Sequence, residues 1–300
     1  MKKYYFECGI ILMNVILRGS ILYAAEAYYN LKENELRIIE RIEEGFMRKL
    51  LKTTTGCPIV QLYLELAQIP ARFQIMKLRL LFLKNILHEK PDSRIKMFLK
   101  LQLEEYKKGD WIKTCIEDLR SLNMSESLEE IEKFSKNQYR KEINKRIKES
   151  AFDYLKRKRK KKGIEINYSD FQMAEYLMPN NQNISIESQQ YLFAVRNRMI
   201  NIPTNFGGKS KCICGQNEEN SHIYTCKIIN EEKENVKFEK VFNGTLIEQV
   251  KILERFRNNM EIRAKNEKIR EQMINENIKF PCDRISDPLT SVKVVSNGKI

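Results

Sequence analysis

Apolar residues recur every three or four positions along most of the chain, and this spacing is typical of amphipathic α-helices. The stripe over 36–50 predicts a helix that ends before the Thr53-Thr54-Thr55-Gly56-Cys57-Pro58 segment, where β-branched residues, Gly and Pro oppose helix. Its expected buried face consists of Leu36, Ile39, Ile42, Phe46 and Leu50. Similar spacing predicts helices over 59–68 and 71–87 and another after Pro91.

The pattern continues more loosely beyond Gly109. Asp110 is a candidate N-cap for a helix over 111–122, and Ser127 with Glu130 matches a capping box. A long stripe that begins at Phe134 or Tyr139 then runs to Leu155. Further helices are expected over 169–178, over 185–199 and from a second capping box, Thr245 with Glu248, to about residue 273.

The chain has only 11 Gly and 7 Pro in 300 residues, a composition that disfavours turns and favours helices. The expected fold class is therefore all-α: a helical bundle, a longer helical region, a small zinc knuckle and a C-terminal helix. The expected parts are a bundle over 1–106, a helical connector over 107–204, the knuckle over 205–232, the helix over 233–280 and a tail over 281–300.

Positive charge is concentrated in one segment. The chain has 54 Lys and Arg against 40 Asp and Glu, a formal net charge of +14. Residues 139–162 contain twelve of the basic residues and three acidic ones, so a local +9 lies there. The helix ends in a basic run, Lys156, Arg157, Lys158, Arg159, Lys160, Lys161 and Lys162. Such a run indicates contact with nucleic-acid phosphates, or alternatively a nuclear-import signal alone.

Three of the seven cysteines and one of the two histidines fall within fifteen residues. Cys212, Cys214, His222 and Cys226 give the spacing C-x-C-x7-H-x3-C, and four such ligands suit a closed tetrahedral Zn²⁺ site. His222 and Cys226 are four positions apart, so one helical turn would direct both at the metal. The alternative is a set of free cysteines near a chance histidine. Two histidines in the whole chain exclude a multi-His catalytic centre.

Residues near this cluster are candidates for nucleic-acid contact. Lys209 and Lys211 add positive charge, and Tyr224 is a candidate for stacking on a base. Aromatic residues of this kind also serve as core, and this second interpretation of Tyr224 stays open.

Three segments together resemble one known family. Ile21-Leu22-Tyr23-Ala24-Ala25-Glu26-Ala27-Tyr28-Tyr29 is similar to the segment that follows the polymerase core in LINE-type (non-LTR) retrotransposon reverse transcriptases. Thr54-Thr55-Gly56-Cys57-Pro58 with Leu64-Glu65-Leu66-Ala67-Gln68-Ile69-Pro70 resembles the helices that come next in that family, and the Cys-Cys-His-Cys cluster resembles its C-terminal knuckle. The resemblance covers about residues 10–105 and 205–260.

The resemblance implies that residues 1–105 form a thumb-like region that follows primer–template, and that the knuckle binds RNA or target DNA. The chain departs from the family at Ala24 and Ala67, where the family usually has Gly, and in the final three-residue gap of the knuckle. No Asp-Asp pair is present to hold the two metal ions of a polymerase. A PD…ExK-like string, Pro91-Asp92 with Glu105-Tyr106-Lys107, brackets a helical stripe and is better explained by chance.

The expected function is therefore a non-catalytic, nucleic-acid-binding C-terminal part of such a reverse transcriptase. Its expected cofactor is Zn²⁺, and its expected partners are RNA or DNA and the polymerase core of the same element. The alternatives are a zinc-stabilised protein-interaction scaffold and a non-functional relic. The N-terminus resembles a signal peptide, but Glu7, Asn14 and Arg18 interrupt it. No apolar run approaches 18 residues. A nuclear and cytoplasmic location without membrane insertion is thus expected.

Overall fold

The structure is a computed structural model, and it describes residues 4–53, 56–105, 110–160, 171–178, 184–197, 199, 211–212, 214, 216–217, 219–226, 241 and 244–275. The chain forms two compact units, Met1–Asn181 (unit 1) and Gln182–Ile300 (unit 2). All regular elements in these described ranges are helical, which confirms the all-α prediction. An isolated antiparallel bridge joins Lys211 and Asn217.

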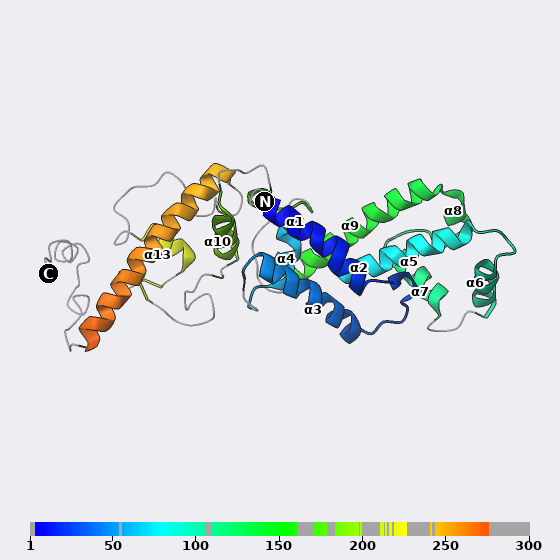
Figure 1. Cartoon of the computed structure of the whole chain (residues 1–300), viewed down its shortest axis with the longest axis horizontal. Helices are drawn as coiled ribbons and strands as arrows, with labels where there is room; N and C mark the ends of the chain where they lie inside the picture. Colours follow the sequence, from blue (N-terminus) through cyan, green and yellow to red (C-terminus); the bar gives the residue numbers. More distant parts are fainter. Residues whose placement is uncertain are drawn as a thin grey trace. The chain divides into compact units, whose positions relative to one another are not determined.

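The helices of unit 1 are shown in Figure 1. They are α1 (Tyr5–Leu12), the π-helical η2 (Met13–Leu17), α2 (Arg18–Ile21), the 3-10 turn η3 (Ala25–Ala27), α3 (Glu33–Leu50), α4 (Ile59–Glu65), α5 (Ala71–Leu87), α6 (Arg94–Glu105), α7 (Trp111–Ser121), α8 (Leu128–Lys133), α9 (Lys136–Lys160) and the 3-10 turn η4 (Glu175–Leu177). The helices of unit 2 are α10 (Ile186–Arg196), α11 (Asn220–Thr225) and α13 (Leu246–Asn275).

Most predicted helix starts are confirmed. Helix α5 begins directly after Pro70, and α7 begins after Asp110. The Ser127 hydroxyl accepts a hydrogen bond from the Glu130 backbone N–H at the start of α8. At the start of α13, the Glu248 carboxylate accepts from the Thr245 backbone N–H at 2.7 Å, which completes the predicted capping box.

Three predicted helices differ from the structure. The first, predicted over 59–68, is α4 and ends at Glu65. The helix expected over 169–178 is wrong in the part described, because residues 171–178 contain only η4. The Ala174 N–H donates to the Glu65 carbonyl, and the Tyr176 hydroxyl donates to the Glu65 carboxylate, so contacts with α4 hold this segment in an extended path. Helix α10 begins after Ser185 as expected but ends at Arg196 instead of 199.

Helix α5 is the centre of unit 1 and contacts α3, α6, α7, α8 and α9. The chain divides between residues 181 and 182, whereas the sequence analysis placed boundaries at 106 and 204. Helices on both sides of residue 106 pack on α5, so the expected bundle and the first part of the expected connector, up to α9, share one core.

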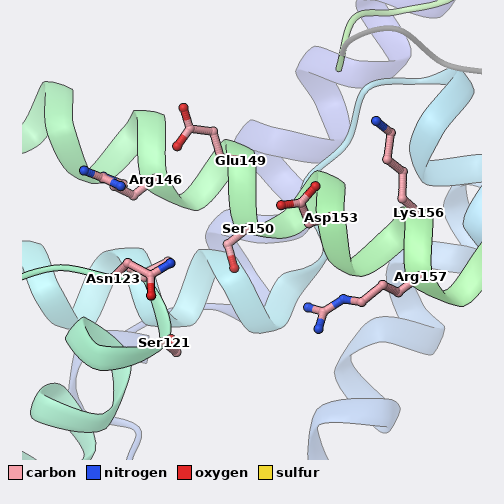
Figure 2. A pocket seen from close by; sticks show the side chains of 9 residues that line it. Ser121, Asn123, Arg146, Glu149, Ser150, Asp153, Lys156 and Arg157 are labelled. Carbon is pink, nitrogen blue, oxygen red and sulfur yellow. The ribbon is translucent and has the colours of Figure 1, made fainter.

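A hollow of about 620 Å³ lies between α9 and the turn that follows α7 (Figure 2). Its α9 wall combines both signs of charge, with Glu149 and Asp153 beside Arg146 and Arg157. In Figure 2, Lys156 and Arg157 leave the helix in different directions. The basic residues at this end of α9 therefore do not share one face.

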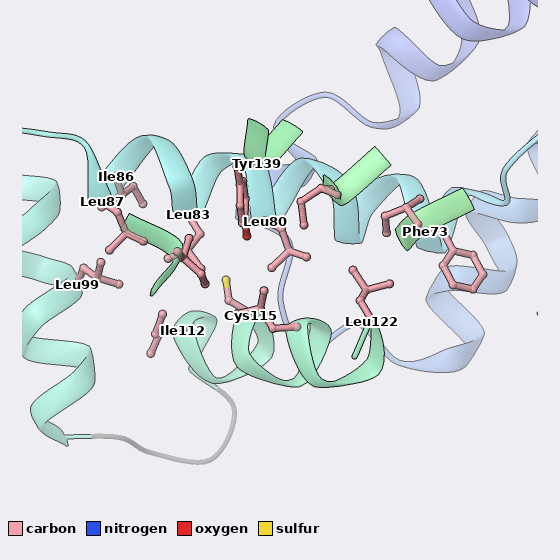
Figure 3. Close-up of a cluster of buried hydrophobic side chains, with 14 of the residues drawn as sticks. Phe73, Leu80, Leu83, Ile86, Leu87, Leu99, Ile112, Cys115, Leu122 and Tyr139 are labelled. Atoms are coloured by element: carbon pink, nitrogen blue, oxygen red, sulfur yellow. The ribbon is translucent and has the colours of Figure 1, made fainter. Parts of the chain in front are cut away.

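The apolar core of unit 1 lies between α5, α7 and α9 (Figure 3). Leu80 and Leu83 of α5 face Ile112 and Cys115 of α7, and Tyr139 of α9 closes the cluster. The predicted α9 stripe is confirmed from Tyr139 onward, whereas Phe134 is exposed. The buried stripe residues on α9 are Tyr139, Ile143, Ile147, Ala151 and Leu155.

The buried face of α3 differs from the predicted one. Ile42 is 44% exposed, whereas Glu40, Glu43 and Glu44 are buried. The Glu43 carboxylate accepts hydrogen bonds from Arg18 Nε at 2.6 Å, from the Tyr63 hydroxyl and from the Ala71 N–H. Partners from α2, α4 and α5 thus make a charged interior possible here.

Candidate metal centre and basic helix

The four residues of the Cys/His motif come together in unit 2. The ligand atoms of Cys212, Cys214, His222 and Cys226 all lie within 4.8 Å of one another. The Cys212 and Cys226 sulfurs are 3.6 Å apart, and the Cys214 sulfur is 3.1 Å from His222 Nε2. The group can therefore hold a metal ion.

Two short local structures position these ligands. Cys212 and Cys214 lie in a chain reversal closed by the Lys211–Asn217 bridge and by the Cys212 N–H, which donates to the Gln216 carbonyl at 2.9 Å. His222 lies in α11, and Cys226 directly follows this helix. The predicted helical turn between His222 and Cys226 is confirmed, because both side chains point at one centre.

The donor set fits a tetrahedral ion. With metal–sulfur bonds of about 2.3 Å and metal–nitrogen bonds of about 2.0 Å, tetrahedral angles separate neighbouring ligand atoms by about 3.5–3.8 Å. The Cys212–Cys226 separation of 3.6 Å already matches this value. The Cys214–His222 pair, at 3.1 Å, needs to open by a few tenths of an ångström.

The surroundings of the Cys212 and Cys214 thiols change their pKa. The neighbouring Cys226 thiol and burial raise the pKa of Cys212, and burial raises the pKa of Cys214. Backbone hydrogen bonds from Cys214 to the first sulfur and from Gln216 to the second oppose these pKa shifts. Since a metal ion binds the thiolate form, its binding would release protons.

Helix α11 is held against α13 by polar side chains that the sequence analysis missed. The Asn259 side-chain amide donates to the Ile223 carbonyl at 2.8 Å, and Arg255 Nε donates to the Tyr224 carbonyl at 3.3 Å. Asn259 is buried, three positions after the buried Phe256. A polar residue on the apolar face of a predicted helix indicates a buried hydrogen bond, and this signal would have identified Asn259 as a contact residue.

Tyr224 is a core residue in this structure. It is 2% exposed, and the Arg255 guanidinium lies 5.0 Å from its ring centroid. No open ring face is left for a base, so the expectation that Tyr224 stacks on nucleic acid is corrected. Lys211 is exposed beside the metal centre.

The described part of the basic run lies at the end of α9, and its side chains do not form one continuous surface. Lys156 Nζ lies over the Phe152 ring, and Lys158 Nζ lies over the Tyr154 ring. Arg159 is 6% exposed, so the expectation that it contacts phosphate is corrected as well. Of the run, only Arg157 is exposed rather than half-buried or buried in the part described. The side chain of Lys160 and residues Lys161, Lys162 and Lys209 lie outside the described part of the chain.

Comparisons with known proteins give no match: no family model, no curated protein and no solved structure is similar to this chain. Among the described helices, none combines the length and apolar character that crossing a bilayer requires.

Proposed function

We propose that this chain is a non-catalytic nucleic-acid-binding protein, stabilised by zinc and related to the C-terminal part of LINE-type reverse transcriptases. The observation that carries the proposal is the convergence of Cys212, Cys214, His222 and Cys226 on one centre. The same chain carries a basic segment that lies on the single helix α9 as far as Lys160. RNA or DNA is the partner, and the polymerase core of the same element is a second partner.

Zinc is the metal that suits these ligands. Three thiolates and one imidazole are soft and borderline donors, and tetrahedral S₃N sites of this type hold Zn²⁺. Since protein atoms supply all four ligands, no position remains for a substrate or a catalytic water. The ion would hold together the reversal over 211–217 and the helix α11.

Two backbone conformations support the family resemblance. Ala24 has φ of 54° and Ala67 has φ of 50°, both in the left-handed region that favours glycine. These are the two positions at which the resembling family usually has Gly. The left-handed φ angles of these two residues are therefore an observation separate from the sequence motifs on which the resemblance rests.

A fluorescence-anisotropy titration with single-stranded RNA at two salt concentrations tests nucleic-acid binding. If about five phosphates are neutralised, the log–log salt slope should be about −3.5. Neutralising residues 156–162 should flatten this slope, and Cys226→Ser should weaken binding, whereas Cys8→Ser, at an exposed cysteine outside the cluster, should change neither. Absence of binding at low salt by the zinc-loaded protein would refute the proposal.

Exposed apolar residues on α6 favour a second candidate, a protein-interaction scaffold. Met97, Phe98 and Leu101 are all more than half exposed. An apolar groove of about 330 Å³ lies beside Phe98 and is also lined by Phe82 and Trp111. Protein association that is insensitive to salt and is lost on Phe98→Ala would favour this candidate.

A further inference from the structure

Helix α9 presents four rows of side chains, each made of residues four positions apart. One row faces the core: Tyr139, Ile143, Ile147, Ala151 and Leu155, with Arg159 at its end, are all buried. Because neighbouring rows are about 90° apart, the burial of this row determines which of the other rows face solvent.

The row that begins at Lys136 contains no carboxylate. Its members are Lys136, Arg140, Asn144, Lys148, Phe152 and Lys156, and the first four are exposed. We call Lys136, Arg140, Lys148 and Lys156 the cationic stripe. The two remaining rows contain acidic residues: one carries Glu149 and Asp153, and in the other Glu142 pairs with Arg146 at 2.7 Å.

The side chains of the stripe are not paired with acidic residues in the described part of the protein. None of the four forms a side-chain ion pair or hydrogen bond there, although Lys156 contacts the Phe152 ring and lines the same hollow as Glu149 and Asp153. The nearest acidic residue before it on the chain, Glu132, pairs with Lys96 at 3.2 Å.

A further cation lies beside the stripe. Burial, Arg140 and Arg18 lower the pKa of Lys77 on α5, and no carboxylate opposes this shift. Lys77 therefore adds positive charge near Arg140, which a bound polyanion would offset.

We infer that the cationic stripe, and not the terminal run 156–162 alone, is the surface along which a nucleic-acid backbone binds; the two share Lys156. The inference rests on the proposed function and deepens it. The stripe extends over twenty residues, or about 30 Å of helix. A long array of like charges without a carboxylate fits a regular polyanion such as a sugar–phosphate chain.

The test compares two double variants of α9 by RNA titration. Arg140→Gln with Lys148→Gln removes two charges from the stripe, whereas Lys141→Gln with Lys145→Gln removes two charges from the row that contains Glu149 and Asp153. All four positions are exposed, so thermal unfolding should match the parent in both variants. The probe is an oligouridylate at two salt concentrations.

The stripe variant should reduce the magnitude of the log–log salt slope by about 1.4, because each lost contact with a single strand contributes about 0.7. The control variant should change the slope by less than half of that amount. Equal effects of the two variants would overturn the stripe but leave the proposed function standing. Absence of binding by the parent chain would refute the proposed function itself.

A third arm uses polyglutamate in place of RNA. The stripe predicts at least tenfold weaker binding of polyglutamate than of oligouridylate at matched charge and salt. Equal affinity, with the same dependence on Arg140 and Lys148, would overturn the assignment to nucleic acid and indicate an acidic protein partner.

Discussion

The two units differ in what holds them together. In unit 1, long helices bury a continuous apolar cluster between α5, α7 and α9. In unit 2, α10 and α13 bury apolar residues such as Phe193 and Phe256, but the cluster around residues 212–226 consists of Cys212, Cys226 and Cys214. A short segment with little apolar surface can be ordered by metal ligands where packing is insufficient.

The comparison also shows two uses of buried polar groups. In unit 1, Arg18 and Glu43 pair inside the core, whereas in unit 2 the buried Asn259 and the half-buried Arg255 bind the carbonyls of a six-residue helix. An isolated helix as short as α11 is unstable in water. Its order therefore depends on its contacts with α13, and a bound metal ion would add to them.

Removing the metal should give the largest effect and should be confined to unit 2. Binding of a structural metal supplies on the order of 10 kcal/mol of apparent free energy, so a chelator or Cys226→Ser should unfold the segment 211–226. Alkylation followed by mass spectrometry measures this loss. Cys212 and Cys214 should become reactive on chelation, while Cys57 and Cys115, buried in unit 1, stay protected.

Exposed Cys8 is the internal standard for that experiment, because it should react with and without metal. Burial raises the pKa of Cys57 to about 11, which further slows its alkylation near neutral pH. If Cys57 or Cys115 became reactive together with Cys212 and Cys214 on chelation, the effect of metal removal would not be confined to unit 2.

Arg18→Met tests the buried pair of unit 1. Arg18 donates to Glu43, to Asn14 and to the Ile69 carbonyl. Removing one partner of a buried ion pair costs about 3–5 kcal/mol, measured by urea unfolding. Arg120→Met, which breaks the exposed pair with Glu126, is the matched control and should cost about 1 kcal/mol or less.

The defect of Arg18→Met should depend on pH. Burial raises the pKa of Glu43 and Arg18 lowers it, so the pKa of this carboxyl should rise further in the variant. When the pKa of a carboxyl is higher in the folded than in the unfolded protein, the folded state is most stable below the unfolded pKa, about 4.3 for Glu. This stability is lost as the pH rises through the folded pKa. The difference from the parent should therefore shrink from pH 7 toward pH 5. A difference that grows toward acid would contradict this sign.

Leu80→Ala should weaken unit 1 by a similar or smaller amount. Leu80 is fully buried between α7 and α9, and truncation of such a leucine costs about 2–5 kcal/mol. Thermal unfolding measures this, with Leu101→Ala on the exposed face of α6 as the control. The metal affinity of unit 2 should be unchanged, and a parallel loss of metal would contradict independent stabilisation.

Ala24→Gly and Ala67→Gly should change the free energy of unfolding least, and they should increase it rather than decrease it. The left-handed conformation costs a non-glycine residue about 1–2 kcal/mol, and the greater freedom of unfolded Gly offsets about half of this. Each variant should thus be about 0.5–1 kcal/mol more stable in urea. Ala264→Gly, on the exposed side of α13, should instead be destabilised by about 1 kcal/mol.

Periodicity and caps predicted most helices of both units, because spacing and N-cap chemistry are local properties. The α9 stripe from Tyr139 to Leu155 needed no information from elsewhere in the chain. The Cys/His ligands were also predictable, because all four lie within one short segment at a spacing typical of a metal site. Their close approach in space followed from that spacing.

The failures have tertiary causes. The buried face of α3 contains Glu40 and Glu43 because Arg72 and Arg18 approach from other helices, and no pattern within α3 encodes those partners. The segment 171–178 is not helical because Glu65 binds it. Arg159 looked like part of a charged surface, but it continues the four-residue row of Leu155 into the interior.

Each row of side chains on α9 also turns gradually around the helix axis. Four residues advance an α-helix by about 400°, so each step along a row turns it by about 40°. The buried row consequently changes partners as it turns, and α9 contacts both α5 and α4. The cationic stripe turns with it, by about 200° between Lys136 and Lys156. A strand that follows the stripe must wind around the helix within about 30 Å, which a flexible single strand can do and a duplex with a persistence length of about 500 Å cannot.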